Sequence, residues 1–455
     1  MLNILKIVAV VSIVIALGLM GNSCGERSNP AETMINNGTN WLAQIDDTAS
    51  LWFNYLENTQ FRDISIYTPP GYVDTASTEY PVLYLLHGFN GNDRYFFDIY
   101  DLKETADEMI SNGEIVPMII ATIDASSQLV EPSSKLLLGG WYTDTDSFGV
   151  EEDVIDTLYF NYTTFDENGN PTGSTAVTDT NDVVKYFAGL YEQLIVRDLK
   201  NTVEATFNVS DDRGDVGIGG HSMGGYGAMK IAMKYPGLFG SVSSMSAPLA
   251  FNGDGSSFLG LREFIPSVLA ENSITGADSA SIANYYDIDT DISTPLTNMM
   301  LSMAAIFSPL PFDSAVYYDT LTADTSHFVP VFNPNPDSVF PIGVLLPFNW
   351  TNAPSSKTVV DSIWNQWLEH DCLSLFDTLS NPFGDSIAIY MDCGADDELY
   401  MKYHMDLFAA KLTASGVDYD YTVYSGYENV NAGHANMVAY RLREVLKFHS
   451  EQFSQ

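Results

Sequence analysis

The stretch that most constrains the fold of this chain is residues 219–225, with the sequence GGHSMGG. It contains the pattern G-x-S-x-G with Ser222 at the centre, an apolar run at 216–218 before it and a helical pattern at 226–235 after it. In a nucleophile elbow a strand ends, the chain turns sharply, and a serine projects above the sheet at the start of a helix. A glycine-rich turn that merely contains a serine is the alternative, but the strand–turn–helix context favours a catalytic Ser222.

The small residues beside Ser222 fit an elbow. Gly220 and Gly224 flank a serine in strained backbone, where a Cβ atom would collide with the neighbouring chain. The N-terminus of the following helix also favours the negative charge that develops on a tetrahedral intermediate. We therefore predict that a Cβ atom would collide at Gly220 and Gly224, and that Gly225, Gly227 and Ala228 let the helix pack close to its strand.

The rest of the chain alternates strand and helix patterns. Continuous apolar runs at 81–86 and 116–122 are typical of strands covered on both faces, and apolar residues recur at helical spacing between Leu102 and Ile110. Further strands are expected at 61–67, 241–245, 387–391 and 419–424, and helices at 186–207, 398–413 and 437–448. This order predicts an α/β domain over 51–455, with a mostly parallel sheet flanked by helices.

Residues 250–380 interrupt this alternation. The segment is rich in Pro, Phe, Ser and Asp, with helical patterns around 297–306 and 359–368. We predict a long insertion that caps the C-terminal edge of the sheet over Ser222 and selects the substrate, because connections at that edge surround the nucleophile. Trp141 and Tyr142 could line the same cleft or serve equally well in packing.

Three histidines, His404, His434 and His449, follow Asp396 and Asp397, the last strong candidates in the chain for the acid of a catalytic triad. In α/β hydrolases the nucleophile is followed by the acid and then by the histidine. His404 shares a helical face with apolar residues, which favours packing. His449 ends the apolar stripe of the last helix, where a positive charge suits the helix dipole. His434 lies in the loop between the last strand and the last helix, so we predict that it is the general base.

The remaining parts of the site come from two loops. Asp396 and Asp397 both follow the strand at 387–391, and either could orient the imidazole. An oxyanion hole needs two backbone N–H groups, which we assign to Met223, after the nucleophile, and to Phe89, after an early strand. His87 is expected to be structural.

Four segments together resemble the esterase D-type family of α/β hydrolases: 86–88 (LHG), 220–228 (GHSMGGYGA), 392–397 (DCGADD) and 433–434 (GH). That family includes S-formylglutathione hydrolases, feruloyl and other carbohydrate-ester esterases, siderophore esterases and mycolyltransferases. The similarity covers residues 55–250 and 385–450, and residues 250–380 match no segment of it. The resemblance implies an α/β-hydrolase fold and a Ser–Asp–His triad with neither metal nor cofactor.

The resemblance also separates the two carboxylates. In this family the acid follows the strand-end glycine by three positions, which implies Asp397 when counted from Gly394. Asp396 is then expected to cap the helix that begins near Glu398. Two other acidic stretches, 166–170 and 287–291, are better explained as a hairpin turn and a solvated loop than as cation sites.

The N-terminus has the layout of an export signal. Residues 1–23 contain one charge, Lys6, and an apolar run at 7–20, and small residues precede Cys24. We predict a signal peptide at 1–23, lipidation of Cys24 and a lipid-anchored tether at 24–50, which places the protein in the cell envelope. A soluble secreted or periplasmic protein is the alternative.

Charge and cysteine content restrict the partners. The chain has 19 basic and 59 acidic residues, for a net charge of −40. Such a charge argues against nucleic acid and anionic membrane surfaces, and leaves the lipid anchor as the expected membrane contact. Cys372 and Cys393 could form one disulfide or remain two buried thiols.

These residues predict a serine carboxylic-ester hydrolase that acts on small-molecule or carbohydrate esters, with acyl or feruloyl esters of carbohydrate as the expected substrates. Two other classes stay open. An acyltransferase would use the same triad but pass the acyl group to an alcohol. A non-catalytic, glycan-binding envelope lipoprotein would bind esters without reacting with them.

Overall fold

The computed structural model describes residues 39–46, 61–75, 79–127, 138–144, 160–165, 171–177, 191–271, 295–308, 328–332, 341–348, 359–384, 387–427 and 430–453. The main sheet contains β1 (Thr39–Asp46), β2 (Phe61–Thr68), β3 (Val82–Leu86), β4 (Ile119–Ile123), β9 (Val216–His221), β10 (Ser241–Met245), β13 (Ala388–Gly394) and β14 (Asp420–Tyr424). Three smaller strand pairs are β5 (Ser126–Ser127) with β6 (Leu138–Gly139), β7 (Phe160–Phe165) with β8 (Pro171–Val177), and β11 (Phe328–Phe332) with β12 (Pro341–Leu345).

The helices lie between these strands in the chain, except for the last one, which follows β14. They are α2 (Tyr95–Tyr100), α3 (Leu102–Ser111), α4 (Tyr191–Gln193), α5 (Lys200–Thr206), α6 (Met223–Lys234), α7 (Ile265–Glu271), α9 (Pro295–Phe307), α11 (Asp361–Leu368), α12 (Cys372–Thr378), α13 (Met401–Ser415) and α14 (Val438–Gln452). A π-helical segment, η3 (Leu194–Leu199), joins α4 to α5, and short 3₁₀ turns are η4 (Arg213–Asp215) and η5 (Gly260–Phe264). Within the described part of the chain, no helix combines the length and apolarity needed to span a membrane.

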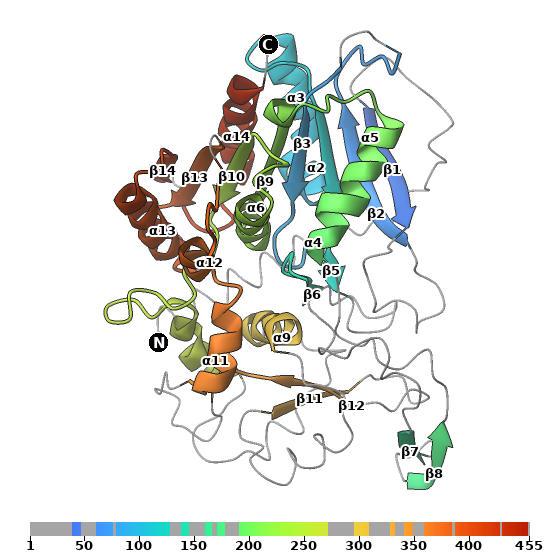
Figure 1. The fold of residues 1–455 in the computed structure, drawn as a ribbon, viewed down its shortest axis with the longest axis vertical. Coiled ribbons are helices and arrows are strands. Elements are labelled where there is room, and N and C mark those ends of the chain that lie inside the picture. The colour runs from blue at the N-terminus through green and yellow to red at the C-terminus, as the bar shows by residue number, and fades with distance from the viewer. Residues whose placement is uncertain are drawn as a thin grey trace.

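The main sheet has the strand order β1-β2-β4-β3-β9-β10-β13-β14 (Figure 1). Neighbouring strands from β4 to β14 are parallel, whereas β2 is antiparallel to both of its neighbours, β1 and β4. The central strands β3 and β9 are buried along their whole length. The prediction of an α/β domain with a mostly parallel sheet is confirmed.

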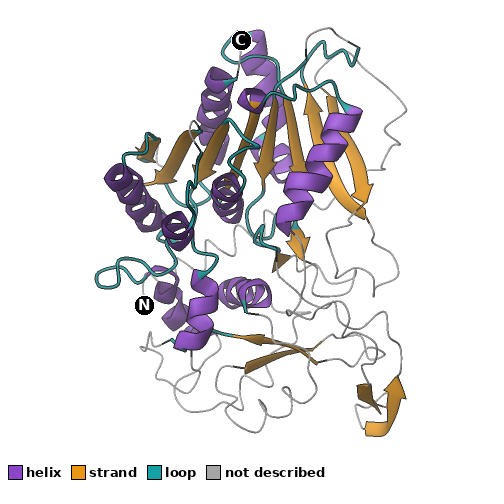
Figure 2. Cartoon of the chain, viewed as in Figure 1, coloured by secondary structure: helices purple, strands orange, loops and turns teal. Residues whose placement is uncertain are grey.

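Helices cover both faces of the sheet (Figure 2). On one face, Leu83 and Leu85 of β3 pack in a core with side chains of α3 and α14. On the other face, Val82, Tyr84 and Leu86 pack in a second core with side chains of α5, α6 and α13. Successive residues of a strand point to opposite faces, so a strand buried on both must be apolar throughout. This is why β3 reads as an unbroken apolar run.

The N-terminal edge of the sheet differs from the expectation. Thr39–Asp46 forms β1 and pairs with β2 along eight residues, from Thr39 with Thr68 to Asp46 with Phe61. The predicted tether at 24–50 was therefore wrong for these residues, because the exposed edge of β2 offers backbone hydrogen-bonding groups that an additional strand satisfies. The signal peptide at 1–23 and Cys24 lie outside the described residues.

The insertion at 250–380 shares a core with the sheet. Side chains of α7, α9 and α11 belong to the same apolar cluster as α6 and β9. Figure 1 shows α9, α11 and the β11–β12 pair beyond the end of the sheet at which β5 and β6 follow β4. Both predicted helices of this segment are present as α9 and α11. The segment is thus built into the domain at the edge where the strands end.

Three smaller predictions have separate outcomes. Cys372 and Cys393 are buried free thiols, so no disulfide joins them. β7 and β8 pair in the antiparallel sense as expected for a hairpin, although its turn at 166–170 lies outside the described residues. The acidic stretch at 287–291 also lies outside them.

Candidate active site

Ser222 occupies a strained turn between β9 and α6. Its backbone angles are φ 56° and ψ −118°, in a region that non-glycine residues rarely adopt. Its N–H donates to the Met245 carbonyl at 2.8 Å, which ties the turn to the next strand. A Cβ atom on Gly224 would lie 1.9 Å from the Leu86 carbonyl oxygen, and one on Gly220 would lie 2.4 Å from Gly224. The predicted collision of a Cβ atom at both glycines is confirmed, and Ser222 remains partly exposed.

Three predicted side chains meet at this edge of the sheet. His434 Nε2 lies 2.9 Å from Ser222 Oγ, and His434 Nδ1 lies 2.9 Å from Asp397 Oδ2. Asp397 also accepts the Leu399 N–H through Oδ1 at 3.0 Å. The three residues follow β9, β13 and β14, and parallel neighbours bring the C-terminal ends of these strands to one edge. Ser222 and His434, which are 212 positions apart in the sequence, are thereby within hydrogen-bonding distance.

Asp397 is an ionised acceptor in a buried position. Burial by itself raises the pKa of a carboxyl group, but the electrostatic interaction with His434 and the hydrogen bond to it hold the Asp397 pKa below its ordinary value. Arg441 and the Leu399 N–H act in the same direction. A carboxylate that stays charged fixes the proton of the imidazole on Nδ1 and leaves Nε2 free to accept from Ser222.

The adjacent carboxylate, Asp396, has a different place from the one expected. Its side chain is exposed, and its backbone N–H donates to the Ala432 carbonyl at 3.0 Å. Helix α13 begins at Met401 behind Tyr400, which has a left-handed conformation and makes no side-chain cap. The prediction that Asp396 caps this helix is therefore wrong. A turn at 397–400 separates Asp396 from the helix, so its carboxylate cannot reach the first N–H groups.

The two predicted oxyanion donors, Met223 and Phe89, lie at a helix N-terminus and in a turn. Met223 is the first residue of α6, and a first-turn N–H has no acceptor within its own helix. Gly91 N–H donates to the Gly88 carbonyl at 2.9 Å, which makes Phe89 and Asn90 the central residues of a turn. Asn90 has φ 62°, as the third position of a type II turn requires. In such a turn the Phe89 N–H takes no part in the closing hydrogen bond.

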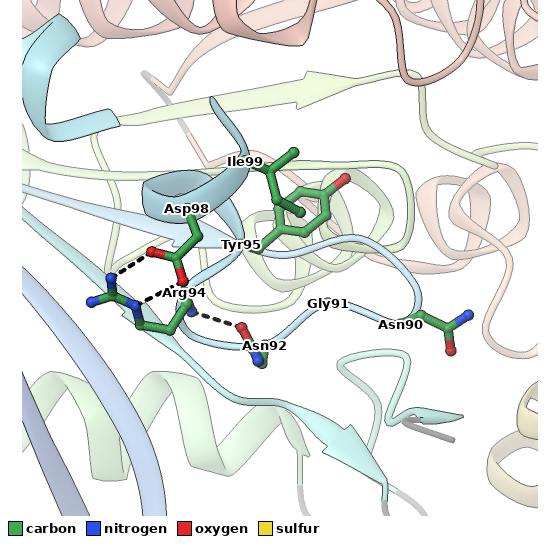
Figure 3. A pocket seen from close by; sticks show the side chains of 7 residues that line it. All are labelled: Asn90, Gly91, Asn92, Arg94, Tyr95, Asp98 and Ile99. Carbon is green, nitrogen blue, oxygen red and sulfur yellow. Dashed lines mark hydrogen bonds and ion pairs between the residues drawn. The ribbon is translucent and has the colours of Figure 1, made fainter. Parts of the chain in front are cut away.

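A small hollow lies along this loop and the start of α2, between Asn90 and Ile99. Figure 3 shows Arg94 paired with Asp98 on one side and the ring of Tyr95 turned away from that pair. The side chains that line this hollow therefore do not point toward one another.

Trp141 and Tyr142 are packing residues in this structure. Tyr142 is fully buried, donates its hydroxyl to the His87 carbonyl at 3.1 Å and lies against Gly227. Trp141 is also buried, and its Nε1–H donates to Ser302 of α9 at 2.9 Å. Of the two roles that the sequence left open, packing is the one observed.

His87 is structural, as predicted. Its Nε2 accepts the Ala125 N–H at 3.0 Å, and its Nδ1 lies 2.8 Å from the Gly88 carbonyl. The ring therefore fixes the loop that carries Phe89 to the end of β4.

His404 and His449 are buried away from Ser222. The Ala250 N–H donates to His404 Nδ1, and His449 lies between the hydroxyls of Ser241 and Ser243. Burial lowers the pKa of each to about 3. The prediction of a packing role for His404 is confirmed. The expectation of a cation at His449 was wrong, because desolvation keeps this imidazole neutral.

These buried histidines should make the protein acid-sensitive. A histidine in the unfolded chain titrates near pH 6.5, so between about pH 6.5 and 3 the unfolded state binds a proton that the folded state does not. The free energy of unfolding therefore decreases by about 1.4 kcal/mol for each unit by which the pH is lowered in this range, for each such histidine. In the His449→Gln variant, the slope of unfolding free energy against pH should be smaller by about this amount between pH 6 and 4. Reversible urea unfolding at several pH values measures it, and an unchanged slope would contradict the lowered pKa.

Sequence reasoning missed the supports of the His434 loop. The His434 N–H donates to Glu398 Oε2 at 3.1 Å, and the His434 carbonyl lies 3.1 Å from His221 Nε2. A buried ion pair between Arg441 and Asp392 lies beside them, with Arg441 Nε 2.7 Å from Asp392 Oδ1. One signal was present in the sequence. Arg441 lies in the apolar stripe of the last helix, where a charged side chain requires a buried partner.

Comparisons with known proteins found similar sequences over part of the chain. A Mycobacterium tuberculosis (strain H37Rv) protein named as an esterase is 28% identical over 195 residues, which is 42% of this chain and 30% of that protein. An uncharacterized protein of Corynebacterium glutamicum is 25% identical over 202 residues, which is 44% of this chain and 35% of that protein. The chain thus matches about a third of the length of these curated relatives.

Solved structures with similar folds include an S-formylglutathione hydrolase from Agrobacterium tumefaciens, with a TM-score of 0.48 and 15% identity over 93% of this chain and 99% of that one. A ferulic acid esterase has a TM-score of 0.47 and 15% identity over 92% of this chain and 100% of that one. The family model described as "Putative esterase" matches residues 58–158 and 164–439, which together exceed half of the chain. The chain therefore belongs to the Putative esterase family.

Proposed function

We propose that this esterase cleaves carboxylic esters through a covalent acyl-enzyme formed on Ser222. The Ser222 hydroxyl gives its proton to His434 Nε2 as the oxygen attacks the acyl carbon. Asp397 holds the Nδ1–H of the imidazole and stabilises the imidazolium that forms. His434 then gives the proton to the departing alkoxide, which leaves as the alcohol.

The second half of the reaction uses the same groups with water as the nucleophile. His434 takes a proton from water, the hydroxide attacks the acyl-enzyme, and the bond to Ser222 Oγ breaks. The proton returns to Ser222, and the acid is released. In both halves we assign the oxyanion to the N–H groups of Met223 and Phe89, because the helix N-terminus and the turn each offer a donor that local structure does not use.

The observation that carries this proposal is the continuous hydrogen-bonded chain from Asp397 through His434 to Ser222, with both distances at 2.9 Å. A structural serine would not need the strained backbone of Ser222 or an orienting carboxylate behind its histidine partner.

For the substrate we propose acyl or feruloyl esters of carbohydrate, and for the location the cell envelope. Both follow from the sequence: the resemblance to carbohydrate-ester esterases, the signal-like layout of residues 1–23 and the small residues before Cys24. An exported esterase of this kind would meet polysaccharide esters outside the cytoplasm.

We further propose that the 250–380 insertion selects the acyl group. Its helix α9 contacts the site through aromatic residues, because Trp141 donates to Ser302 of α9 and its ring stacks against Phe89 with centroids 6.2 Å apart. A chain of contacts therefore joins the insertion to the turn that carries the Phe89 N–H. Deleting the insertion would remove part of the main core, so its role is better read from the choice of substrate.

Purified protein should react with a fluorophosphonate probe and hydrolyse p-nitrophenyl esters. We expect kcat/KM to differ by at least tenfold between acetyl, butyryl and feruloyl esters. An apolar pocket discriminates between substrates by about 1–3 kcal/mol for each methylene group in which they differ. Adding acceptor sugars and analysing the products separates a hydrolase from an acyltransferase. No labelling and no turnover of any ester would refute the proposed function, whereas equal rates for all acyl groups would refute the role of the insertion.

A further inference from the structure

Every polar atom of His434 has a partner. Its ring contacts Ser222 and Asp397, and its backbone N–H donates to Glu398. Its carbonyl lies 3.1 Å from His221 Nε2 and 3.5 Å from Arg441 Nη1. The main chain on both sides of the imidazole is therefore fixed, although His434 belongs to a loop.

His221 is the partner that links this loop to the nucleophile. It is the last residue of β9 and the covalent neighbour of Ser222, and its side chain is fully buried. Ser222 Oγ and His221 Nε2 thus approach the same residue, one at the ring of His434 and the other at its carbonyl. The two rings of His221 and His434 lie with their centroids 5.1 Å apart.

The tautomer of His221 follows from its partners. A carbonyl can only accept, so Nε2 must carry the hydrogen, which leaves Nδ1 as the acceptor. Tyr95 Oη lies 2.8 Å from this Nδ1 and donates to it, and the two rings are stacked with centroids 6.1 Å apart. Tyr100 Oη lies 3.4 Å from Tyr95 Oη and extends the buried chain. Figure 3 shows the Tyr95 ring turned away from the exposed Arg94–Asp98 pair.

We propose that His221 is a positioning residue for the esterase reaction, which fixes the backbone of His434 relative to Ser222 through an Nε2–H donated to the His434 carbonyl. The inference rests on the proposed function. Since His221 is bonded covalently to the nucleophile, any movement of the elbow carries the support of the general base with it. The distance between Ser222 Oγ and His434 Nε2 is then set by one rigid unit and not by two independent loops.

The charge state of His221 suits this role. Burial lowers the pKa of His221 well below its ordinary value, and the nearby His434 and Arg441 act in the same direction. His221 therefore remains neutral while His434 becomes positive in the transition state, and it keeps its acceptor for Tyr95. A second positive ring 5.1 Å away would oppose the imidazolium.

The kinetic test compares His221→Leu with His221→Gln. Leucine removes the donor, and we expect kcat for p-nitrophenyl acetate to fall about 10- to 100-fold at nearly constant KM, because a small misplacement of a catalytic group has effects of that size. Glutamine restores an N–H donor on a side chain of similar length, and most of kcat should return. His449→Leu is the matched control, since it removes another fully buried histidine, on α14, whose ring contacts Ser241 and Ser243 of β10 and not the His434 loop.

The outcomes separate cleanly when thermal melting shows that all variants are folded. Wild-type kcat in His221→Leu overturns the inference, and so does an equal loss of kcat in His449→Leu. Absence of rescue by glutamine also counts against a donor role. If instead the wild-type protein turns over no ester, the proposed function has failed. ¹⁵N NMR of the folded protein then still reads the tautomer: protonated Nε2 and bare Nδ1 on His221 from pH 6 to 8 support the geometry, and a protonated Nδ1 contradicts it.

Discussion

Replacing Ser222 with alanine is expected to lower kcat for short p-nitrophenyl esters by about six orders of magnitude, as the loss of the nucleophile does in serine hydrolases with a catalytic triad. The variant keeps the imidazole, the carboxylate and both N–H donors, but it has no oxygen with which to form the acyl-enzyme. What remains is the modest acceleration that oxyanion stabilisation and substrate binding provide to direct attack by water. Steady-state hydrolysis and fluorophosphonate labelling measure the loss together.

A matched control for this variant is Ser244→Ala. Ser244 is a buried serine on the neighbouring strand β10, and its hydroxyl donates to the Gly225 carbonyl in the first turn of α6 at 3.0 Å. Its loss should lower stability by about 1 kcal/mol without lowering turnover appreciably. Substantial hydrolysis by folded Ser222→Ala would exclude Ser222 as the nucleophile. An equal loss in Ser244→Ala would show that the effect belongs to the packing of the elbow.

The second large effect is expected at Asp397. In Asp397→Asn, the amide can no longer accept the Nδ1–H as a charged group, and it favours the imidazole tautomer whose Nε2 cannot take a proton from Ser222. We expect kcat to fall by about four orders of magnitude. The substitution nearly preserves the volume of the side chain and its contact with the Leu399 N–H, so a folded protein should result.

Asp396→Asn supplies the comparison one residue away. The Asp396 side chain is exposed and makes no cap for α13, so its neutralisation should change turnover less than threefold, by the ordinary size of surface substitutions. Ester hydrolysis by both variants over the same pH range decides between them. Should Asp396→Asn lose turnover while Asp397→Asn keeps it, the orienting carboxylate has been assigned to the wrong residue.

The contrast between these carboxylates shows where sequence reasoning reached its limit. Local pattern placed both just past a strand end, and only a family spacing favoured Asp397 over Asp396. The capping role given to Asp396 assumed a helix that begins near Glu398, but α13 begins at Met401. The point at which a helix begins depends on a few local hydrogen bonds. Here the Leu399 N–H donates to the side chain of Asp397, which belongs to the turn that precedes α13.

The histidines also show which properties the sequence predicts and which it does not. His434 could be selected from the order of the chain alone, since the general base of such a fold follows the last strand. His449 was expected to be a cation because its position in the helix was visible, whereas its burial between Ser241 and Ser243 was not. A pKa depends on desolvation and on partners from distant segments, and neither can be read from neighbours in the sequence.

What the sequence determined by itself is therefore local: the elbow at Ser222, the buried strands, the alternation of strand and helix, and the loops from which Asp397 and His434 come. Apolar period and glycine sterics act over a few residues, so they are written in consecutive positions. The tertiary structure alone decided the pairing of Thr39–Asp46 with β2, the burial of Trp141 and Tyr142, and the contact of His221 with the His434 carbonyl. All three depend on which segments meet in space. A sheet edge, a buried ring and a buried carbonyl are each stabilised by a partner from another segment of the chain.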